Sequence, residues 1–417
     1  MAEIKPLTAL HYDLERAGPL QELLAPPYDV IDPDERERLA ARSPYNVVHV
    51  DLPVGEPDPY AEAAQTLARW RDEGAVVLDT TTAVWGLTQD FTDPTGERRT
   101  RSGVLCAVRV EDYGAGRIRP HERTHPGPKE DRLRLTRATR ANLSPIFALY
   151  DDPRGISWGE LAAHTTGPPF GEATGDDGTV NRLWRIEHEE ALDAVELALE
   201  GTELLIADGH HRYETARVYA DEVGGEGPHR WVLMCLVALQ DPGLALYPTH
   251  RLVRGVDPEG LADAIRRDFD IEEIGRDGLV PRAAGADGRI VMGYMDSHFK
   301  RAFRLTLKDA AIADHALEGK SEPYRRLDTA VLEALALRGA LGMSEEDIAE
   351  KHGLDYSKDF ADAREAVESG RADAAFFMAP TPVDQVREVA EAGTSMPPKS
   401  TYFYPKIPTG LVFNVLE

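Results

Sequence analysis

The chain has 417 residues, of which 42% are hydrophobic and 29% are charged, a composition typical of a globular protein with a sizeable core. Its 47 basic and 73 acidic residues leave a net charge of −26, which repels nucleic acid and anionic membranes. We therefore expect neither as a partner; the small anionic ligand that we do expect follows from the local motifs described below. A homo-oligomer is compatible with this composition.

The two cysteines, Cys106 and Cys235, each lie in an apolar run, which predicts buried core thiols rather than catalytic ones. Two cysteines provide no disulfide framework, and this favours a reducing compartment. The first residues lack the apolar stretch of a signal peptide, and no run approaches the roughly 20 residues of a membrane span. We therefore expect a cytoplasmic protein.

Composition and hydrophobic periodicity divide the chain into three expected regions. Residues 1–152 and 179–314 alternate strand-like and helix-like segments, which predicts two α/β regions. Residues 152–178 are rich in Gly, Pro, Thr and Asp, which is typical of a linker or a long surface loop. Residues 315–417 are predicted to be mainly helical, with strands that close onto the body near the end. The expected fold class is α/β (α+β), with a mixed-sheet core.

The strongest local signal is Asp208-Gly-His-His-Arg212, which follows the apolar run 204–207 and precedes a helical segment. A strand-to-helix turn directs free backbone N–H groups and the positive end of the helix dipole toward one point, where an anion can bind. The glycine permits a tight turn, and the aspartate could orient a histidine or hold a metal. The alternative is a capping aspartate with solvated histidines. The candidates are Gly209, His210 and Arg212 for phosphate binding and Asp208 and His211 for catalysis.

A second signal is the segment 117–140, which holds eight basic and three acidic residues and so carries a charge of +5 in an acidic chain. Such an island attracts anions locally. Within it, Glu122 is a candidate general base, and the phosphate-binding candidates are His121, Lys129 and Arg132. Because prolines flank His121 and His125, their spacing does not indicate a helical zinc site. The alternatives are a helix face paired with acids elsewhere and a solvated glutamate.

Two shorter segments complete the set of candidates. Tyr247-Pro-Thr-His-Arg251 is a polar insert at the end of an apolar strand, and it contributes His250 and Arg251. Lys399 and Lys406 lie in the stretch 393–415, which contains no acidic residue. This basic, aromatic segment could complete a phosphate site, or it could simply dock as an edge strand.

Five motifs together resemble those of a widespread prokaryotic family of unknown function, DUF1015, over nearly the whole chain. The resemblance names a family and implies no reaction. The motifs are Ala25-Pro-Pro-Tyr-Asp-Val30, Pro120-His-Glu-Arg-Thr124 with Asp131-Arg132, Ala207-Asp-Gly-His-His-Arg-Tyr-Glu-Thr215, Pro248-Thr-His-Arg251 and Lys399-Ser-Thr-Tyr-Phe-Tyr-Pro-Lys406.

Residues 203–216 also resemble the nucleotide-phosphate motif of the ParB/sulfiredoxin superfamily, which implies a ParB/sulfiredoxin-like strand-turn-helix phosphate site. Sulfiredoxin needs a cysteine in this turn, where this chain has His210. ParB proteins add a basic helix-turn-helix module, of which we find no sign in the sequence. The free serine kinase branch, which uses a carboxylate near the substrate hydroxyl, therefore fits best.

We hypothesise a nucleotide-dependent phosphotransferase that acts on a small polar metabolite such as serine or phosphoserine. The implied cofactors are ATP or ADP and Mg²⁺, because phosphoryl transfer depends on positioned cations. A metal-dependent hydrolase or phosphatase is an alternative, with ligands among His121, Glu122, His125, Asp208, His210 and His211. A third hypothesis is a nucleotide-binding protein without catalytic activity.

Overall fold

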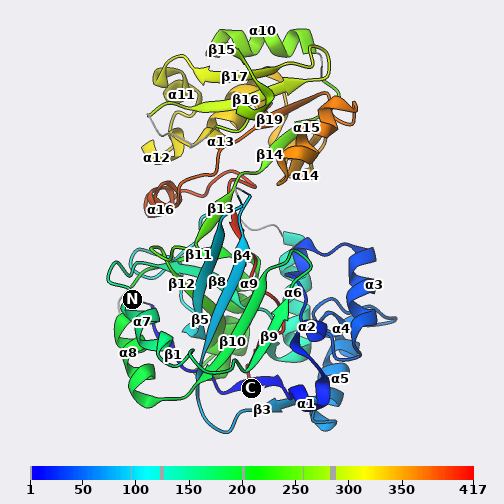
Figure 1. Ribbon diagram of the computed structural model, residues 1–417, viewed down its shortest axis with the longest axis vertical. Helices are drawn as coiled ribbons and strands as arrows, with labels where there is room; N and C mark the ends of the chain where they lie inside the picture. Colours follow the sequence, from blue (N-terminus) through cyan, green and yellow to red (C-terminus); the bar gives the residue numbers. More distant parts are fainter. Residues whose placement is uncertain (1, 95, 123–125, 200–201, 257, 282–287) are drawn as a thin grey trace. The chain divides into compact units, whose positions relative to one another are not determined.

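The apolar runs of the sequence form the inner strands of two large sheets, one in each of two compact units (Figure 1). The computed structural model describes residues 2–94, 96–122, 126–199, 202–256, 258–281 and 288–417. The first unit comprises residues 1–120, 124–244 and 405–417, and the second comprises residues 121–123 and 245–404. The predicted mixed α/β class is confirmed. The two units, however, are interleaved in sequence and differ from the three consecutive regions that we expected.

The first unit is built on a mixed sheet that has nine strands in the described residues, in the order β6-β11-β8-β12-β5-β4-β10-β9, with β1 beside β5. Strands β8 and β12 are almost wholly buried, which explains why both read as continuous apolar runs. A smaller sheet has the order β3-β2-β21-β7. The strands are β1 (Ile4–Lys5), β2 (Ala9–Tyr12), β3 (Val76–Leu78), β4 (Val84–Thr92), β5 (Arg98–Arg109), β6 (Ile118–Arg119), β7 (Ala141–Asn142), β8 (Ile146–Tyr150), β9 (Gly171–Thr174), β10 (Val180–Ile186), β11 (Leu204–Asp208), β12 (Trp231–Ala238) and β21 (Phe413–Val415).

Helices α7, α8 and α9 pack on one face of the large sheet, where Leu161, Val195 and Tyr213 join its buried core. Both cysteines lie on adjacent central strands and are fully buried, as predicted. Burial raises the pKa of both thiols, so neither is a thiolate at neutral pH. The helices of this unit are α1 (Leu14–Ala17), α2 (Leu20–Leu23), α3 (Pro33–Arg42), α4 (Val48–Asp51), α5 (Pro59–Asp72), α6 (Pro126–Thr139), α7 (Ile156–Ala162), α8 (Glu189–Leu199) and α9 (His210–Val223).

The stretch 152–178 is not a linker, because it contains α7 and the edge strand β9. Asp152 accepts hydrogen bonds from the backbone N–H groups of Ile156 and Ser157. An aspartate that suggested a loop therefore caps the start of helix α7. Strand β9 pairs with β10 in antiparallel register. Short edge strands tolerate the small and polar residues that suggested a linker.

The second unit is built on a sheet of six strands, as far as the described residues show, in the order β15-β17-β16-β19-β14-β18, with a separate pair β13-β20. Residues 315–417 are therefore less helical than expected, since β18 and β19 belong to this sheet. The strands are β13 (Ala245–Tyr247), β14 (His250–Val253), β15 (Phe269–Ile274), β16 (Val291–Asp296), β17 (Ala302–Leu307), β18 (Leu354–Ser357), β19 (Ala374–Phe377) and β20 (Tyr402–Tyr404). The helices are α10 (Pro258–Asp268), α11 (Ala310–Ala316), α12 (Glu322–Arg325), α13 (Asp328–Val331) with a π-helical continuation (Leu332–Ala340), α14 (Glu345–Glu350), α15 (Phe360–Glu368) and α16 (Val383–Glu391).

In the part of the chain that the structure describes, no helix combines the length and the hydropathy that a membrane crossing requires.

The chain returns to the first unit at residue 405, and a buried arginine holds it there. Arg101 on β5 is 1% exposed and donates hydrogen bonds to the side chain of Gln89 and to the carbonyl oxygen of Pro405. Gln89 in turn donates to the carbonyl oxygen of Lys406 at 3.0 Å. The centre of the sheet therefore fixes the backbone on which the Lys406 side chain is mounted.

We predict that Arg101→Met destabilises the protein by about 2 kcal/mol or more, because two buried acceptors lose their donor at about 1–3 kcal/mol each. Urea denaturation followed by circular dichroism measures the change. Arg98→Met is the matched control, since Arg98 is exposed on the same strand and should be nearly neutral. Equal stabilities of the two variants would contradict the anchoring role of Arg101.

Candidate functional site

The turn between β11 and α9 has the strand-turn-helix geometry predicted from the sequence. Strand β11 ends at Asp208, helix α9 begins at His210, and Gly209 between them has φ +94° and ψ +27°. A β-carbon on Gly209 would lie 3.0 Å from the guanidinium carbon of Arg212. The position therefore requires glycine for both its backbone conformation and its close contact. The first N–H groups of α9 have no partner within the helix, and the helix dipole favours an anion beside them.

Asp208 holds two cations at this turn. Its Oδ1 accepts a hydrogen bond from Lys406 Nζ at 2.7 Å, and its Oδ2 accepts one from Arg212 Nη2 at 3.0 Å. Burial acts to raise the pKa of Asp208, but the charges of Lys406 and Arg212 outweigh it and hold that pKa well below its usual range. Asp208 is therefore a stable carboxylate that positions the two cations, and it is a weak base.

Arg212 makes further contacts that fix its side chain. Nη1 donates to Ser144 Oγ and to the carbonyl oxygen of Pro145, and Ser144 Oγ also accepts from Thr409 Oγ1 at 3.0 Å. Arg212 Nε is buried without a hydrogen-bond acceptor among the residues that the structure describes. One strong donor of the guanidinium therefore has no protein partner in this part of the chain.

Arg132 is the residue of the basic segment that reaches this site. It lies on α6, which packs against α9, and its Nη1 donates to the backbone and side-chain oxygens of Asp51 at 2.8 and 3.1 Å. Asp131 accepts from Nε at 2.7 Å, and the guanidinium lies 4.3 Å from the centre of the Tyr28 ring. Burial acts to lower the pKa of Arg132, but Asp51 and Asp131 outweigh it, so Arg132 stays charged although it is only 5% exposed.

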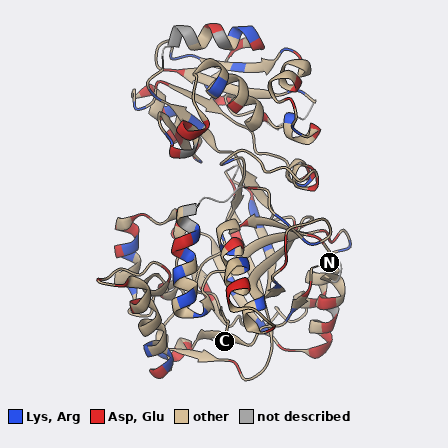
Figure 2. Ribbon diagram, turned by 180° about the vertical axis from the view of Figure 1, so that it is seen from behind, with Lys and Arg blue, Asp and Glu red and all other residues tan. Residues whose placement is uncertain are grey.

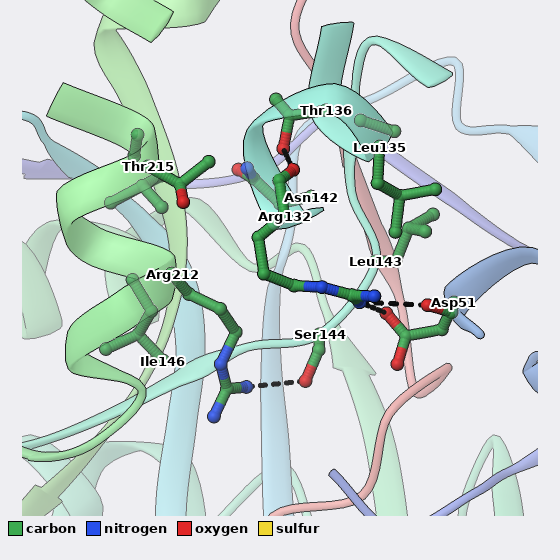
Figure 3. A pocket seen from close by; sticks show the side chains of 13 residues that line it. Asp51, Arg132, Leu135, Thr136, Asn142, Leu143, Ser144, Ile146, Arg212 and Thr215 are labelled. Atoms are coloured by element: carbon green, nitrogen blue, oxygen red, sulfur yellow. Dashed lines mark hydrogen bonds and ion pairs between the residues drawn. The ribbon is translucent and has the colours of Figure 1, made fainter. Parts of the chain in front are cut away.

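A small cavity lies between α6 and α9, and the side chains of Arg132 and Arg212 point toward it from the two helices (Figure 3). Asp51, Ser144 and Thr215 also line it, and its volume is about 40 Å³. At roughly 10–15 Å³ for each water molecule, it holds about three waters. It is too small to enclose a nucleotide, so only a terminal group of such a ligand could enter it.

The charges around this cavity are largely compensated within the protein. Arg132, Arg212 and Lys406 each pair with a carboxylate of the protein, Arg132 with Asp51 and Asp131, and Arg212 and Lys406 with Asp208. Burial raises the pKa of Asp51, while Arg132 and Arg212 act to lower it. The site is therefore a neutral cluster of ion pairs, and not the uncompensated positive patch that residue counting suggested.

Three arginines of the remaining basic segment, Arg119, Arg137 and Arg140, are paired with acids elsewhere, which is the alternative that the sequence left open. Figure 2 shows basic and acidic residues interspersed along the helices. Arg119 pairs with Glu203 at 2.9 Å, and Arg137 on α6 pairs with Glu222 on α9 at 2.5 Å. Lys129 lies on the first half of α6 and is half-buried. Of the predicted candidates, the structure thus brings together Arg132, Lys406 and the residues of the Asp208–Arg212 turn. In that turn, His210 is buried and His211 is half-buried.

The remaining candidates belong to the second unit. His121 is buried, with Nε2 2.8 Å from Thr401 Oγ1, and its carbonyl oxygen accepts from the N–H of Met396 at 2.7 Å. Glu122 beside it is half-buried, and its assignment as a general base stays a prediction. Arg123 and His125, its neighbours in sequence, lie outside the described residues.

His250 and Arg251 on β14 have the surroundings of structural residues. His250 Nδ1 accepts from the N–H of Met378 at 3.2 Å, and burial together with the charge of Arg251 lowers the pKa of His250 to about 4. Arg251 is 3% exposed and donates to the carbonyl oxygens of Thr249, Pro398 and Lys399. These contacts attach the 396–400 segment to the second unit, and a phosphate-binding role for His250, Arg251 and Lys399 stays a prediction.

Three contributors to the site were missed from the sequence. Tyr28 lies in the Ala25–Val30 motif, but the sequence did not indicate its contact with Arg132. Burial raises the pKa of Tyr28 to about 12. Asp51 ends the short helix α4, and Ser144 follows β7. Neither Asp51 nor Ser144 lies in a recognisable sequence motif. Each reaches the arginines because distant segments of the chain pack together.

A metal centre is not apparent in the described ranges, where no group of three or more His, Cys, Asp or Glu side chains is placed to hold an ion. Of the ligands expected for a metal-dependent hydrolase, His125 lies outside these ranges. Both oxygens of Asp208 accept from cations. The donors present around the turn suit an anion, and Mg²⁺ would have to take its oxygen ligands largely from a bound phosphate and water.

Comparison with known proteins assigns the chain to a family. The profile of the family described as "protein of unknown function (DUF1015)" matches residues 4–330. The chain belongs to the DUF1015 family. No curated protein matches it.

Three solved structures match parts of the chain at low similarity. A conserved hypothetical protein from Pyrococcus furiosus is 16% identical, with a TM-score of 0.35 over 70% of this chain and 89% of that chain. A mutant of free serine kinase in complex with ADP is 13% identical, with a TM-score of 0.40 over 78% of this chain and 95% of that chain. SbnI with a C-terminal truncation, from Staphylococcus aureus, is 10% identical, with a TM-score of 0.37 over 73% of this chain and 85% of that chain. Similarity at this level assigns neither a ligand nor an activity to this chain.

We predict that Gly209→Ala destabilises the protein more than Gly155→Ala does. Both glycines cap a helix in the left-handed region, so an alanine at either position costs about 1–2 kcal/mol in backbone strain. Only at Gly209 does the new methyl group meet a guanidinium, whereas at Gly155 nothing lies within 4 Å. Overpacking should add about 1–3 kcal/mol, measurable by urea denaturation. Equal losses would show that the Gly209–Arg212 contact is not close in solution.

Proposed function

We propose that this protein is a nucleotide-dependent phosphotransferase that uses the Asp208–Arg212 turn to bind a nucleotide phosphate. The observation that carries the proposal is the turn itself. Gly209 brings the N-terminus of α9 and the guanidinium of Arg212 to one point, beside the cavity that Arg132 also lines. Backbone N–H groups, a helix dipole and fixed arginines are the groups that bind phosphate oxygens in proteins.

The small cavity supports a terminal phosphate as the group that enters the site. A phosphate oxygen would accept from Arg212 Nε, which has no acceptor among the described residues, and from the first N–H groups of the helix. Leaving a buried donor without a partner costs about 1–3 kcal/mol, so binding an acceptor there is favourable. The existing ion pairs keep the arginines in place, so little reorganisation is needed when the ligand arrives.

The reaction that we propose is transfer of the terminal phosphoryl group of ATP or ADP to a hydroxyl group. The hydroxyl oxygen of a small polar metabolite, such as serine, forms a bond to phosphorus as the bond to the nucleotide oxygen breaks. Arg212 and the N-terminus of α9 would contact the phosphoryl oxygens, while Arg132 and Lys406 are held nearby by their own carboxylates. The reaction needs a general base for the hydroxyl proton; Asp208 is a weak base because its two cations hold it as a stable carboxylate, and Glu122 stays our candidate. Mg²⁺, when bound with the nucleotide, would neutralise part of the phosphate charge.

We predict that Arg212→Ala weakens ADP binding by about 10-fold or more, because a charge-assisted hydrogen bond contributes about 1.5–3 kcal/mol. Isothermal titration calorimetry at low salt measures this change. Arg217→Ala is the matched control, since Arg217 lies on the same helix and pairs with Asp112 and Glu214. Circular dichroism establishes that both variants fold. Unchanged affinity of a folded Arg212→Ala would refute the phosphate site.

Glu122→Gln should lower kcat by about 10²–10⁴-fold while ADP binding survives, because the amide cannot accept the hydroxyl proton. Transfer of labelled phosphate to serine and to other hydroxyl metabolites measures kcat. Glu130→Gln on the exposed face of α6 serves as the control and should turn over normally. A normal rate for Glu122→Gln would exclude Glu122 as the base. Nucleotide binding without turnover of any metabolite would favour a non-catalytic nucleotide-binding protein.

A further inference from the structure

The second unit contains a cavity that the proposed function does not use. It lies between helix α10 and strands β15, β16 and β17, at the end of the unit where Figure 1 shows α10 beside β15. Its volume is about 370 Å³, which is within the size range of small-molecule sites. Helix α10 contributes Ala262, Ile265 and Arg266, and the sheet contributes aromatic and aliphatic side chains.

The walls of this cavity are mainly apolar and aromatic, and two of the apolar side chains are exposed at its edge. Phe269, Tyr294 and Phe303 line it from three neighbouring strands. Ile271 is 39% exposed and Phe299 is 44% exposed, and both belong to the lining. Exposed large apolar side chains that converge on one hollow indicate a binding surface more strongly than the same residues scattered over a protein.

A buried carboxylate gives the cavity a specific polar feature. Asp296 is 1% exposed; its Oδ1 accepts from the N–H of Phe299 at 2.6 Å, but its Oδ2 has no hydrogen-bond partner among the described residues. The hydroxyl of Tyr294, two residues earlier on β16, is also buried without such a partner. The two groups are neighbours: burial, the charge of Asp296 and a hydrogen-bonding contribution from Asp296 all raise the pKa of the Tyr294 phenol, although neither atom has a partner at full hydrogen-bond geometry among the described residues.

We propose that this cavity binds a small aromatic heterocycle whose ring N–H donates to Asp296. The apolar walls would hold the ring, and its N–H would donate to Asp296 Oδ2, which has no partner at full hydrogen-bond geometry among the described residues. Arg266, Lys308 and Asp270 also line the cavity; Arg266 pairs with Asp263, and Lys308 donates to the carbonyl oxygens of Arg266 and Arg267. This site is separate from the Asp208–Arg212 turn in its residues and does not depend on the phosphotransferase proposal.

The test uses indole and benzofuran, two rings of nearly equal size of which only indole has an N–H. Ligand-observed NMR with the full chain should show saturable indole binding, with benzofuran weaker by about 10-fold or more, since a hydrogen bond to a charged group is lost. Ala262→Phe should fill the cavity and abolish indole binding. Ala311→Phe is the matched control, because Ala311 is an exposed helical alanine outside the lining.

Several results would overturn the proposal. Indole binding that survives in Ala262→Phe would place the ring elsewhere, and equal affinities for the two rings would exclude recognition of the N–H by Asp296. Absence of saturable indole binding to the wild-type chain would exclude a site for this ligand class. If Ala262→Phe does not fold, Ile271→Asp at the exposed edge takes its place, and it should weaken binding of both rings by adding a charge to an apolar wall.

Discussion

The contact of Asp208 with Lys406 and Arg212 is the interaction on which the first unit's site depends. It joins a turn at the centre of the chain to a segment that lies about two hundred residues further on. A buried carboxylate is stable only when it is paired and hydrogen-bonded, and Asp208 meets this condition by holding two cations at once. The direction of the Arg212 and Lys406 side chains depends on this contact, and so does the close approach of the guanidinium to Gly209.

Charge compensation explains how an acidic protein can keep three cations together in a buried place. Each arginine is neutralised by a carboxylate that is itself desolvated, and the pair Arg132–Asp51 repeats on α6 what Arg212–Asp208 does on α9. Such pairs add little to stability relative to apolar packing, but they hold planar donors in fixed directions. An anion at this site would bind to a prearranged set of donors and would gain from the helix N-terminus rather than from net positive charge.

The sequence predicts the parts of this structure that depend on neighbouring residues. The turn at Asp208 was predictable because an apolar strand, an Asp-Gly pair and a helix follow one another directly. Asp51 and Ser144 were not, because packing brings them to the arginines from distant segments. The basic segment was recognised by counting, but only the folded chain distinguishes Arg132, which reaches the site, from Arg137, which pairs with Glu222. His250 and Arg251 look like ligand-binding residues in sequence, whereas their burial and carbonyl contacts depend on β14 lying inside a sheet.

The return of the chain at residue 405 has a consequence for the order in which the protein can be assembled on the ribosome. The mixed sheet of the first unit has all nine of its described strands by residue 238, but the lysine that pairs with Asp208 is synthesised only after the whole of residues 245–404. Until then Asp208 has Arg212 as its cation and lacks the second one. A nascent chain can therefore collapse around its sheet early, while the charge cluster at the turn is completed among the last events of synthesis.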